Sequence, residues 1–537
     1  MNYLNTFCSR VALAAIFGVT ACAQAPSAET GDDQQLIAGA CKVRNEKLKR
    51  DMTAKEILAL KDPVALAVLQ STGGCPTTLD EIAAKLRKTD SVNCKDDPAQ
   101  PPAGSSVHLV SERAQVLKKP DSYRAVVARS CNNRGDHELL MSLFGVTASA
   151  TKLPQESVEM MGFDKTAGVF NYYARENNKW TFFGSSKDLI GDGYNCDANG
   201  ACVPKAASKT RCASCHLGGG LVMKEFDSPW VHWEHIIDTP GAADLAARFK
   251  MTWGATKEDG LAMEGTVRNG NSAWNDKRVD FLKTKSVAEL LRPLFCTVDV
   301  NLQSMVGSSG SVPSSVRNDF LLDPRIGGFD SVPIDSADYT ALAAANGQAV
   351  KDQSGAPLKD KDGKAVTDTV FAWTFPERGV ADKDYVDKLV SKKIIDDDFA
   401  ADVLSIDMTR PVFSARRCEL INFAPSLTAA QMTPQGIRDG FKKSLAGKTG
   451  DAAELLAKIN DVADTQKHKD AATKYLAACK ARPKKEFLAD ALAYSGQLRT
   501  IVKKSLVLME FAEAMQSDKF DGGADKRSFD PATCTLK

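Results

Sequence analysis

Near the middle of the 537-residue chain, residues 211–216 read Arg-Cys-Ala-Ser-Cys-His. Two thiols three residues apart can add to the two vinyl groups on one edge of a porphyrin, and the imidazole that follows can reach the iron. This spacing is the attachment signature of a c-type haem. The sequence therefore predicts one covalent haem c, with Cys212 and Cys215 as the thioether cysteines and His216 as the proximal iron ligand.

Three other interpretations of the motif are weaker. A zinc ribbon needs a second cysteine pair or paired histidines to complete four ligands, and the chain has no other Cys-x-x-Cys, although Cys196 and Cys202 lie close upstream. A thioredoxin-type redox pair belongs at a strand-to-helix turn of a βαβ unit, which the flanking sequence does not suggest. A structural disulfide between cysteines three apart would be strained.

The amino-terminal segment predicts export. One positive side chain precedes the apolar run Val11–Val19, which is too short to span a bilayer as a mature helix. Val-Thr-Ala-Cys22 follows and resembles a bacterial lipobox, so we expect residues 1–21 to be a signal peptide and Cys22 to carry a lipid. The alternative is ordinary cleavage after Ala23. Either route predicts a periplasmic protein, and the lipobox predicts an anchor in the outer membrane.

Cysteine usage fits an oxidising compartment. Of the 14 cysteines, one lies in the signal peptide, one is the predicted lipid site and two belong to the haem motif, which leaves ten and allows up to five disulfides. Cys196 and Cys202 bracket an Asp-Ala-Asn-Gly turn, so we expect them to pair. Cys479 and Cys534 are a candidate pair within the carboxy-terminal region.

The pattern along the chain predicts an α+β protein with several segments. Gly347–Asp368 is rich in turn signals and suggests an exposed hairpin, and Tyr385–Leu404 has the pattern of an amphipathic helix. After the signal peptide we expect a tether (22–34), a helical segment (35–95), a β-rich haem c domain (96–280), a mixed α/β region (281–424) and a helical domain (425–537).

Local signals place individual elements within these segments. Thr53-Ala-Lys-Glu56 and Thr78-Leu-Asp-Glu81 each have the capping-box spacing of a helix start. Val169–Tyr173 and Trp180–Phe183 are rich in aromatic and β-branched residues and flank Arg175–Asn178, which predicts a β-hairpin with aromatic side chains on both faces. Such a sheet could form a wall of the haem cleft or serve as plain core.

The sixth iron ligand is open. His232 and His235 are three residues apart and follow the motif closely, so each is a candidate for the distal metal ligand. Met223, Met251 and Met263 are the thioether candidates, and an open distal position is the remaining possibility. A second metal on the two histidines is disfavoured, because on a helix the intervening glutamate would point away from both rings.

Two further features surround the motif. Gly218–Gly220 follow His216 directly and would let the backbone pass close to a porphyrin or form a flexible turn. Bulky aromatics that could pack on haem or in an ordinary core follow downstream: Trp230, Trp233, Trp253 and Trp274.

On Cys212, Cys215 and His216, the chain resembles the monohaem c-type cytochromes of the bacterial envelope. An aromatic β segment before the motif also resembles, more loosely, the small periplasmic cytochromes whose haem is cross-linked to a lysine and which oxidise hydroxylamine or handle nitric oxide. The chain departs from them because it is far longer and offers no lysine that aligns with the cross-link; Lys205, Lys209 and Lys224 are merely nearby.

These observations predict a carrier of single electrons in the periplasm that docks a redox partner protein and contacts the membrane only through its lipid. One alternative is a haem enzyme acting on a nitrogen oxide, hydroxylamine or peroxide, and another is a haem-based gas-sensing lipoprotein. The 69 basic and 68 acidic residues nearly cancel, and no basic block suggests nucleic acid.

Overall fold

The structure is a computed structural model of the whole chain. It describes residues 41–70, 74–88, 104–111, 122–130, 139–147, 157–223, 242–304, 313–346, 374–461, 466–504 and 527–537. The predicted signal peptide and tether with Cys22, the histidines His232 and His235, and the turn-rich segment Gly347–Asp368 lie outside these residues.

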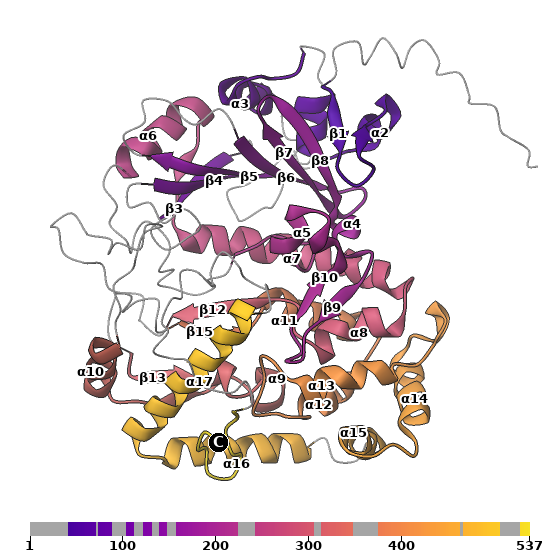
Figure 1. Cartoon of the computed structure of the whole chain (residues 1–537), viewed down its shortest axis with the longest axis vertical. Helices are drawn as coiled ribbons and strands as arrows, with labels where there is room; N and C mark the ends of the chain where they lie inside the picture. The colour runs from indigo at the N-terminus through magenta and orange to yellow at the C-terminus, as the bar shows by residue number, and fades with distance from the viewer. Residues whose placement is uncertain are drawn as a thin grey trace, which may run out of the picture.

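A nine-stranded sheet dominates one half of the molecule (Figure 1), with the strand order β11-β3-β4-β5-β6-β7-β8-β1-β2. Strands β3 to β8 form an antiparallel meander, while β11 and β1 join its two edges in parallel. The strands are β1 (Val43–Asn45), β2 (Arg50–Asp51), β3 (Gly104–Ser111), β4 (Ser122–Ser130), β5 (Leu139–Thr147), β6 (Ser157–Asp164), β7 (Val169–Glu176), β8 (Lys179–Ser185) and β11 (Thr256–Lys257).

The predicted aromatic hairpin is confirmed as β7 and β8. Its turn residues Asn177 and Asn178 have φ of 48° and 62°, the left-handed conformation that asparagine tolerates and that a tight hairpin requires. On β7, Phe170 and Tyr172 face one core and Tyr173 faces the other, so both sides of the sheet are buried.

Helices cover both faces of the sheet. One face packs on η1 (Ala65–Leu69), α3 (Leu79–Lys88) and α6 (Ala242–Trp253), which together bury a compact core. The other face lies over α4 (Ser186–Ile190) and the long helix α7 (Gly260–Lys283), and this core continues into the second half of the molecule. In Figure 1, α5 (Arg211–Cys215) lies between the sheet and this second half.

The second half is mainly helical, with three small two-stranded sheets, β9–β10, β12–β15 and β13–β14. Its elements are β9 (Tyr194–Cys196), β10 (Cys202–Pro204), α8 (Val287–Phe295), β12 (Val300–Ser304), β13 (Ser315–Arg317), α9 (Pro324–Gly327), β14 (Ser331–Pro333), α10 (Ser336–Asn346), β15 (Thr374–Arg378), α11 (Val380–Ser391), α12 (Asp397–Leu404), α13 (Ala415–Glu419), α14 (Pro434–Leu445), α15 (Asp451–Asn460), α16 (Gln466–Ala481) and α17 (Lys484–Lys504). Short 3₁₀ turns link them at η3 (Lys205–Ser208), η4 (Asn318–Phe320), η5 (Leu420–Phe423) and η6 (Ala429–Gln431). Among the described residues, no helix combines the length and the apolar character needed to cross a bilayer.

The expectation of a mixed α and β protein is confirmed at this coarse level. Thr53 and Glu56 form the predicted capping box at the start of α2 (Ala54–Ala59), and Thr78 and Glu81 hydrogen-bond reciprocally at the start of α3. The pattern over 35–95 did not indicate β1 and β2, because strands this short carry no periodicity.

The predicted helix over Tyr385–Leu404 is two helices, α11 and α12. Lys393 between them has a φ of 54°, which a helix cannot accommodate. Asp396 then accepts a hydrogen bond from the amide of Phe399 and starts α12. The prediction of one continuous helix failed because Asp396, in the middle of the amphipathic pattern, caps the start of a second helix.

Eight of the ten remaining cysteines form disulfides. The expected pairs Cys196–Cys202 and Cys479–Cys534 are confirmed, and Cys41–Cys75 and Cys296–Cys418 join them. Cys94 and Cys131 lie outside the described residues.

Candidate functional site: the Cys-x-x-Cys-His turn

The motif forms one helical turn. Helix α5 runs from Arg211 to Cys215, and the amide of His216 donates to the carbonyl of Cys212 at 2.8 Å and ends the turn. Residues three apart lie on one face of a helix, so Cys212 and Cys215 share a face. Both are thiols in this structure, in contrast to the disulfides elsewhere, and both are half-buried.

The imidazole of His216 is held by the loop that follows it. Its Nδ1 lies 2.7 Å from the carbonyl oxygen of Gly220. Because a carbonyl oxygen only accepts, Nδ1 carries a proton. A metal-binding histidine is commonly oriented in this way, by a backbone carbonyl on its other ring nitrogen. The ring also packs on Tyr172, with 4.9 Å between the ring centroids.

Side chains from three elements hold the backbone of Leu217–Leu221. Tyr194 donates to the carbonyl of Leu217 at 3.0 Å, and Trp274 donates to that of Gly218 at 2.7 Å. The Tyr172 hydroxyl lies 2.8 Å and 3.1 Å from the carbonyl oxygens of Gly219 and Gly220. Asn271 accepts from the amide of Leu221 and donates to its carbonyl. A loop whose polar groups are satisfied by buried side chains is a rigid support for His216.

The glycines of this loop serve close packing against protein. Gly219 has a φ of +71°, and a Cβ there would lie 2.8 Å from the carbonyl oxygen of Ser186 in α4. A Cβ on Gly220 would lie 2.2 Å from the side-chain oxygen of Asn271 in α7. These glycines therefore let the loop sit against two helices.

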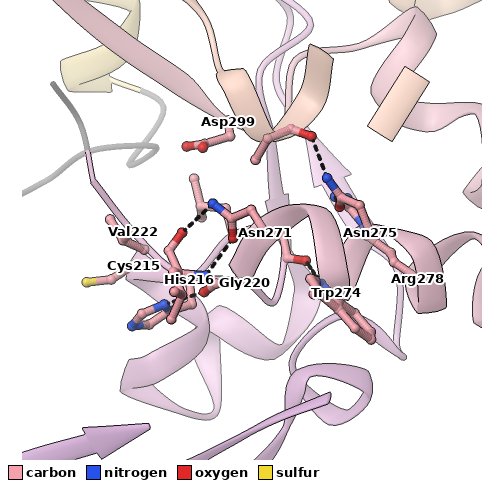
Figure 2. A pocket seen from close by; sticks show the side chains of 13 residues that line it. Cys215, His216, Gly220, Val222, Asn271, Trp274, Asn275, Arg278 and Asp299 are labelled. Carbon is pink, nitrogen blue, oxygen red and sulfur yellow. Dashed lines mark hydrogen bonds between the residues drawn. The ribbon is translucent and has the colours of Figure 1, made fainter. Parts of the chain in front are cut away.

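The space between the loop and α7 is too small for a porphyrin. It encloses about 10 Å³, lined among others by Asn275 and Arg278 of α7 and by Asp299, which is room for roughly one water molecule. Figure 2 shows the sulfur of Cys215 and the ring of His216 on the side away from Asn275 and Arg278. Cys215 and His216 also line this cavity, at the end opposite Asn275 and Arg278.

Arg278 is the main charge in the wall behind the loop. It is 1% exposed, its Nη2 donates to the Tyr194 hydroxyl at 3.2 Å, and its guanidinium lies 4.5 Å from the ring centroid of Tyr385. A buried guanidinium stacked on an aromatic ring is favourable. This wall ties the loop to α7 and α11.

The protonation of Cys212 argues against a reactive dithiol. Burial, and secondarily the negative charge of Glu159, raise the pKa of its thiol far above the usual value, although Arg211 lowers it. A redox-active thiol pair or a zinc thiolate needs the opposite shift. Arg211 itself forms salt bridges with Glu159 and Glu176, at 3.0 Å and 2.5 Å, and fixes the start of α5 to the sheet.

The distal candidates are only partly placed. His232 and His235 lie outside the described residues. Met251 is 75% exposed on α6, which packs on the sheet face away from α5, so it is not a ligand candidate in this fold. Met223 and Met263 are buried in the core beneath the loop.

Sequence reasoning missed most of the residues that orient the motif. Tyr172 and Trp274 appeared only among the aromatics near the motif, and Asn271 and Tyr194 gave no signal. Side chains that bind backbone groups of a distant loop leave no pattern in the sequence, because the partners here lie 23 to 56 residues away. The glycine run was the one local sign of close packing.

Comparison with the models of known families, with curated proteins and with solved structures finds no match to this chain.

Proposed function

We propose that this protein carries one covalent haem c on Cys212, Cys215 and His216 and transfers single electrons outside the cytoplasmic membrane. The observation that carries the proposal is the geometry of the motif: two thiols on one face of a helical turn, followed by an imidazole whose Nδ1 proton is held by the Gly220 carbonyl. This donor set fits thioether attachment and axial ligation of iron.

We further propose that the amino-terminal segment directs export of the protein and anchors it to a membrane. The lipobox at Cys22 favours a lipid anchor in the outer membrane, and the disulfides suit an oxidising compartment. The partner is then a redox protein reached in the periplasm. The remaining mass of the chain offers surface for docking it.

In this proposal, groups of the protein hold the imidazole of His216 in one orientation. Once bound, the haem supplies an iron that exchanges one electron. The carbonyl of Gly220 holds the Nδ1 proton of His216, and the Tyr172 hydroxyl beside the same carbonyl limits how strongly it accepts. The buried wall behind the loop would hold the loop, and with it His216, in place.

The test is covalent haem on the purified full-length protein, produced together with a c-type haem maturation system. Cys212→Ala and Cys215→Ala are each expected to keep one thioether, so that any haem bound shows the pyridine haemochrome spectrum of a porphyrin with one unreacted vinyl group, and the double variant is expected to carry none covalently. Ser208→Ala is the matched control, because Ser208 is exposed, lies outside the motif and donates to the nearby carbonyl of Lys205. Haem that acidified acetone extracts from the unaltered protein, or an unaltered protein that carries no haem, would overturn the proposal.

The optical spectrum then separates the carrier from the alternatives. A reduced low-spin spectrum that carbon monoxide leaves unchanged supports an electron carrier with two strong axial ligands. A spectrum that shifts with carbon monoxide supports an open distal site, and so the haem enzyme or the gas sensor. Single changes His232→Ala and His235→Ala test each candidate ligand, since loss of the low-spin spectrum identifies the residue.

A further inference from the structure

Two disulfides lie in contact below the haem motif. The sulfurs of Cys196, Cys202, Cys296 and Cys418 all lie within 4.8 Å of one another, although they come from three separate parts of the chain. Cys196 and Cys202 close the β9–β10 hairpin. Cys296 follows α8, and Cys418 lies in α13. Two disulfides at this separation are close enough for a thiolate of one to reach a sulfur of the other.

The hairpin is fixed against its partners, so this contact is a property of the fold. The amide of Cys202 donates to the carbonyl of Thr297 at 2.8 Å, and the amide of Thr297 donates to the carbonyl of Gly200 at 3.0 Å. A Cβ on Gly200, which has a φ of +85°, would lie 3.0 Å from the Cβ of Cys418. The hairpin tip therefore rests directly on α13.

The two disulfides differ sharply in access. Cys196 is exposed, whereas Cys202, Cys296 and Cys418 are buried, at 0%, 2% and 7% exposure. A dissolved thiol can therefore reach the cluster only at the Cys196 sulfur. Access of this kind decides which sulfur is attacked first.

A cation lies beside the accessible sulfur. Nη1 of Arg292 lies 3.5 Å from Sγ of Cys196, and the guanidinium also pairs with Glu289 at 2.7 Å. Once the disulfide is opened, an adjacent guanidinium stabilises a thiolate on Cys196. The positive charge of Arg292 beside Cys196 therefore favours thiol–disulfide exchange there, although Glu289 offsets part of this charge.

We propose that these four cysteines form a thiol–disulfide exchange site, in which an external protein dithiol reduces Cys196–Cys202 and the reducing equivalents pass inward to Cys296–Cys418. The first external thiolate attacks Cys196, the bond to Cys202 breaks, and a mixed disulfide forms. The second external thiol resolves it, so the external pair leaves as a disulfide and both cysteines are thiols.

The inner step uses no further reagent. Cys202, as thiolate, attacks one sulfur of Cys296–Cys418, and the other sulfur leaves and takes up a proton. Cys196 then attacks Cys202, which reforms the hairpin disulfide and releases the second buried thiol. Two electrons and two protons have moved from the external dithiol to Cys296 and Cys418. The cluster is thus a two-electron site separate from the proposed haem.

The test follows the reduction of each disulfide in the native full-length protein. Dithiothreitol is the probe, aliquots are quenched with acid and alkylated, and peptide mass spectrometry reads each pair. Cys479–Cys534 is the matched control, because both of its residues are also buried, at 1% and 0% exposure. We expect Cys296–Cys418 to be reduced at least about tenfold faster than this control, because it is reached through the exposed pair.

Removing the exposed pair isolates the relay. In Cys196→Ala/Cys202→Ala, we expect the reduction of Cys296–Cys418 to slow by about tenfold or more, to the rate of the control disulfide. An unchanged rate in this variant, or equal rates for the two buried disulfides in the unaltered protein, would overturn the proposal. The second comparison decides the matter even if the variant fails to fold.

The single variant Cys196→Ala gives a positive signature. It leaves Cys202 as a buried thiol beside Cys296–Cys418, and we expect a new disulfide between Cys202 and either of these residues, with the other released as a thiol. Persistence of Cys296–Cys418 with an unexchanged Cys202 thiol contradicts the inner step.

Discussion

The hydroxyl of Tyr172 is a single group that both stabilises the loop and acts on the proposed iron ligand. It is buried, at 1% exposure, and lies 2.8 Å and 3.1 Å from the carbonyl oxygens of Gly219 and Gly220. Tyr172→Phe removes the hydroxyl and keeps the ring against His216. We expect the free energy of unfolding to fall by about 1–2 kcal/mol, because a buried carbonyl loses its donor.

If the proposed haem is bound, the same change should lower its reduction potential. Without the tyrosine hydroxyl, the Gly220 carbonyl accepts more strongly from Nδ1 of His216, which makes the imidazole a stronger donor and favours ferric iron. A differential effect of about 0.5–1 kcal/mol corresponds to about 20–40 mV, since a tenfold change is about 59 mV for one electron.

Tyr173→Phe is the matched control. The neighbouring phenol is also buried, but it points to the other face of the sheet and donates to Asp62 at 2.6 Å. We expect it to lose stability without a change in potential. Urea unfolding and a potentiometric titration of both variants make the comparison. A potential in Tyr172→Phe that matches Tyr173→Phe, or that rises, refutes the link from hydroxyl to carbonyl to imidazole.

Other predictions address the loop, a buried acid and a disulfide. Gly220→Ala should lower the free energy of unfolding by roughly 2 kcal/mol or more and reduce haem incorporation, because its Cβ would lie 2.2 Å from Asn271. Gly265→Ala in α7 has open space around its Cβ and should raise the free energy of unfolding by about 0.5–1 kcal/mol. Equal stabilities of the two variants in urea would contradict this. Burial raises the pKa of Asp382 to about 6, so the folded protein keeps a proton that the unfolded chain loses, and the free energy of unfolding should fall as pH rises from about 4 to 6. In Asp382→Asn this fall, measured by unfolding curves across that range, should be smaller by about 2–3 kcal/mol. An unaltered fall would exclude Asp382 as its source. Replacing both cysteines of Cys479–Cys534, which closes a 55-residue separation, with serine should cost up to about 4 kcal/mol, and an unchanged denaturation midpoint would argue against the pairing.

Local signals in the sequence predicted local structure well. The threonines Thr53 and Thr78 marked two helix starts because a capping box is completed within four residues. The Asn177–Asn178 turn and the Cys196–Cys202 hairpin were predictable for the same reason: each needs only one turn of known backbone conformation.

Features that depend on distant partners were not predictable. Strand β1 pairs in parallel with β8 across more than a hundred residues, and Cys296 pairs with Cys418 at a separation of 122. Nothing in either segment specifies its partner before the chain is folded. The motif itself could be recognised from six residues, but the side chains that hold its histidine could not, because each acts on a peptide group rather than on a patterned side chain.

The most direct test of the account is a pyridine haemochrome spectrum of the full-length protein after extraction with acidified acetone. The account predicts one haem per chain that stays with the protein and shows the spectrum of a porphyrin with both vinyl groups saturated by Cys212 and Cys215. A colourless extracted protein, or a spectrum with unreacted vinyl groups, would contradict it.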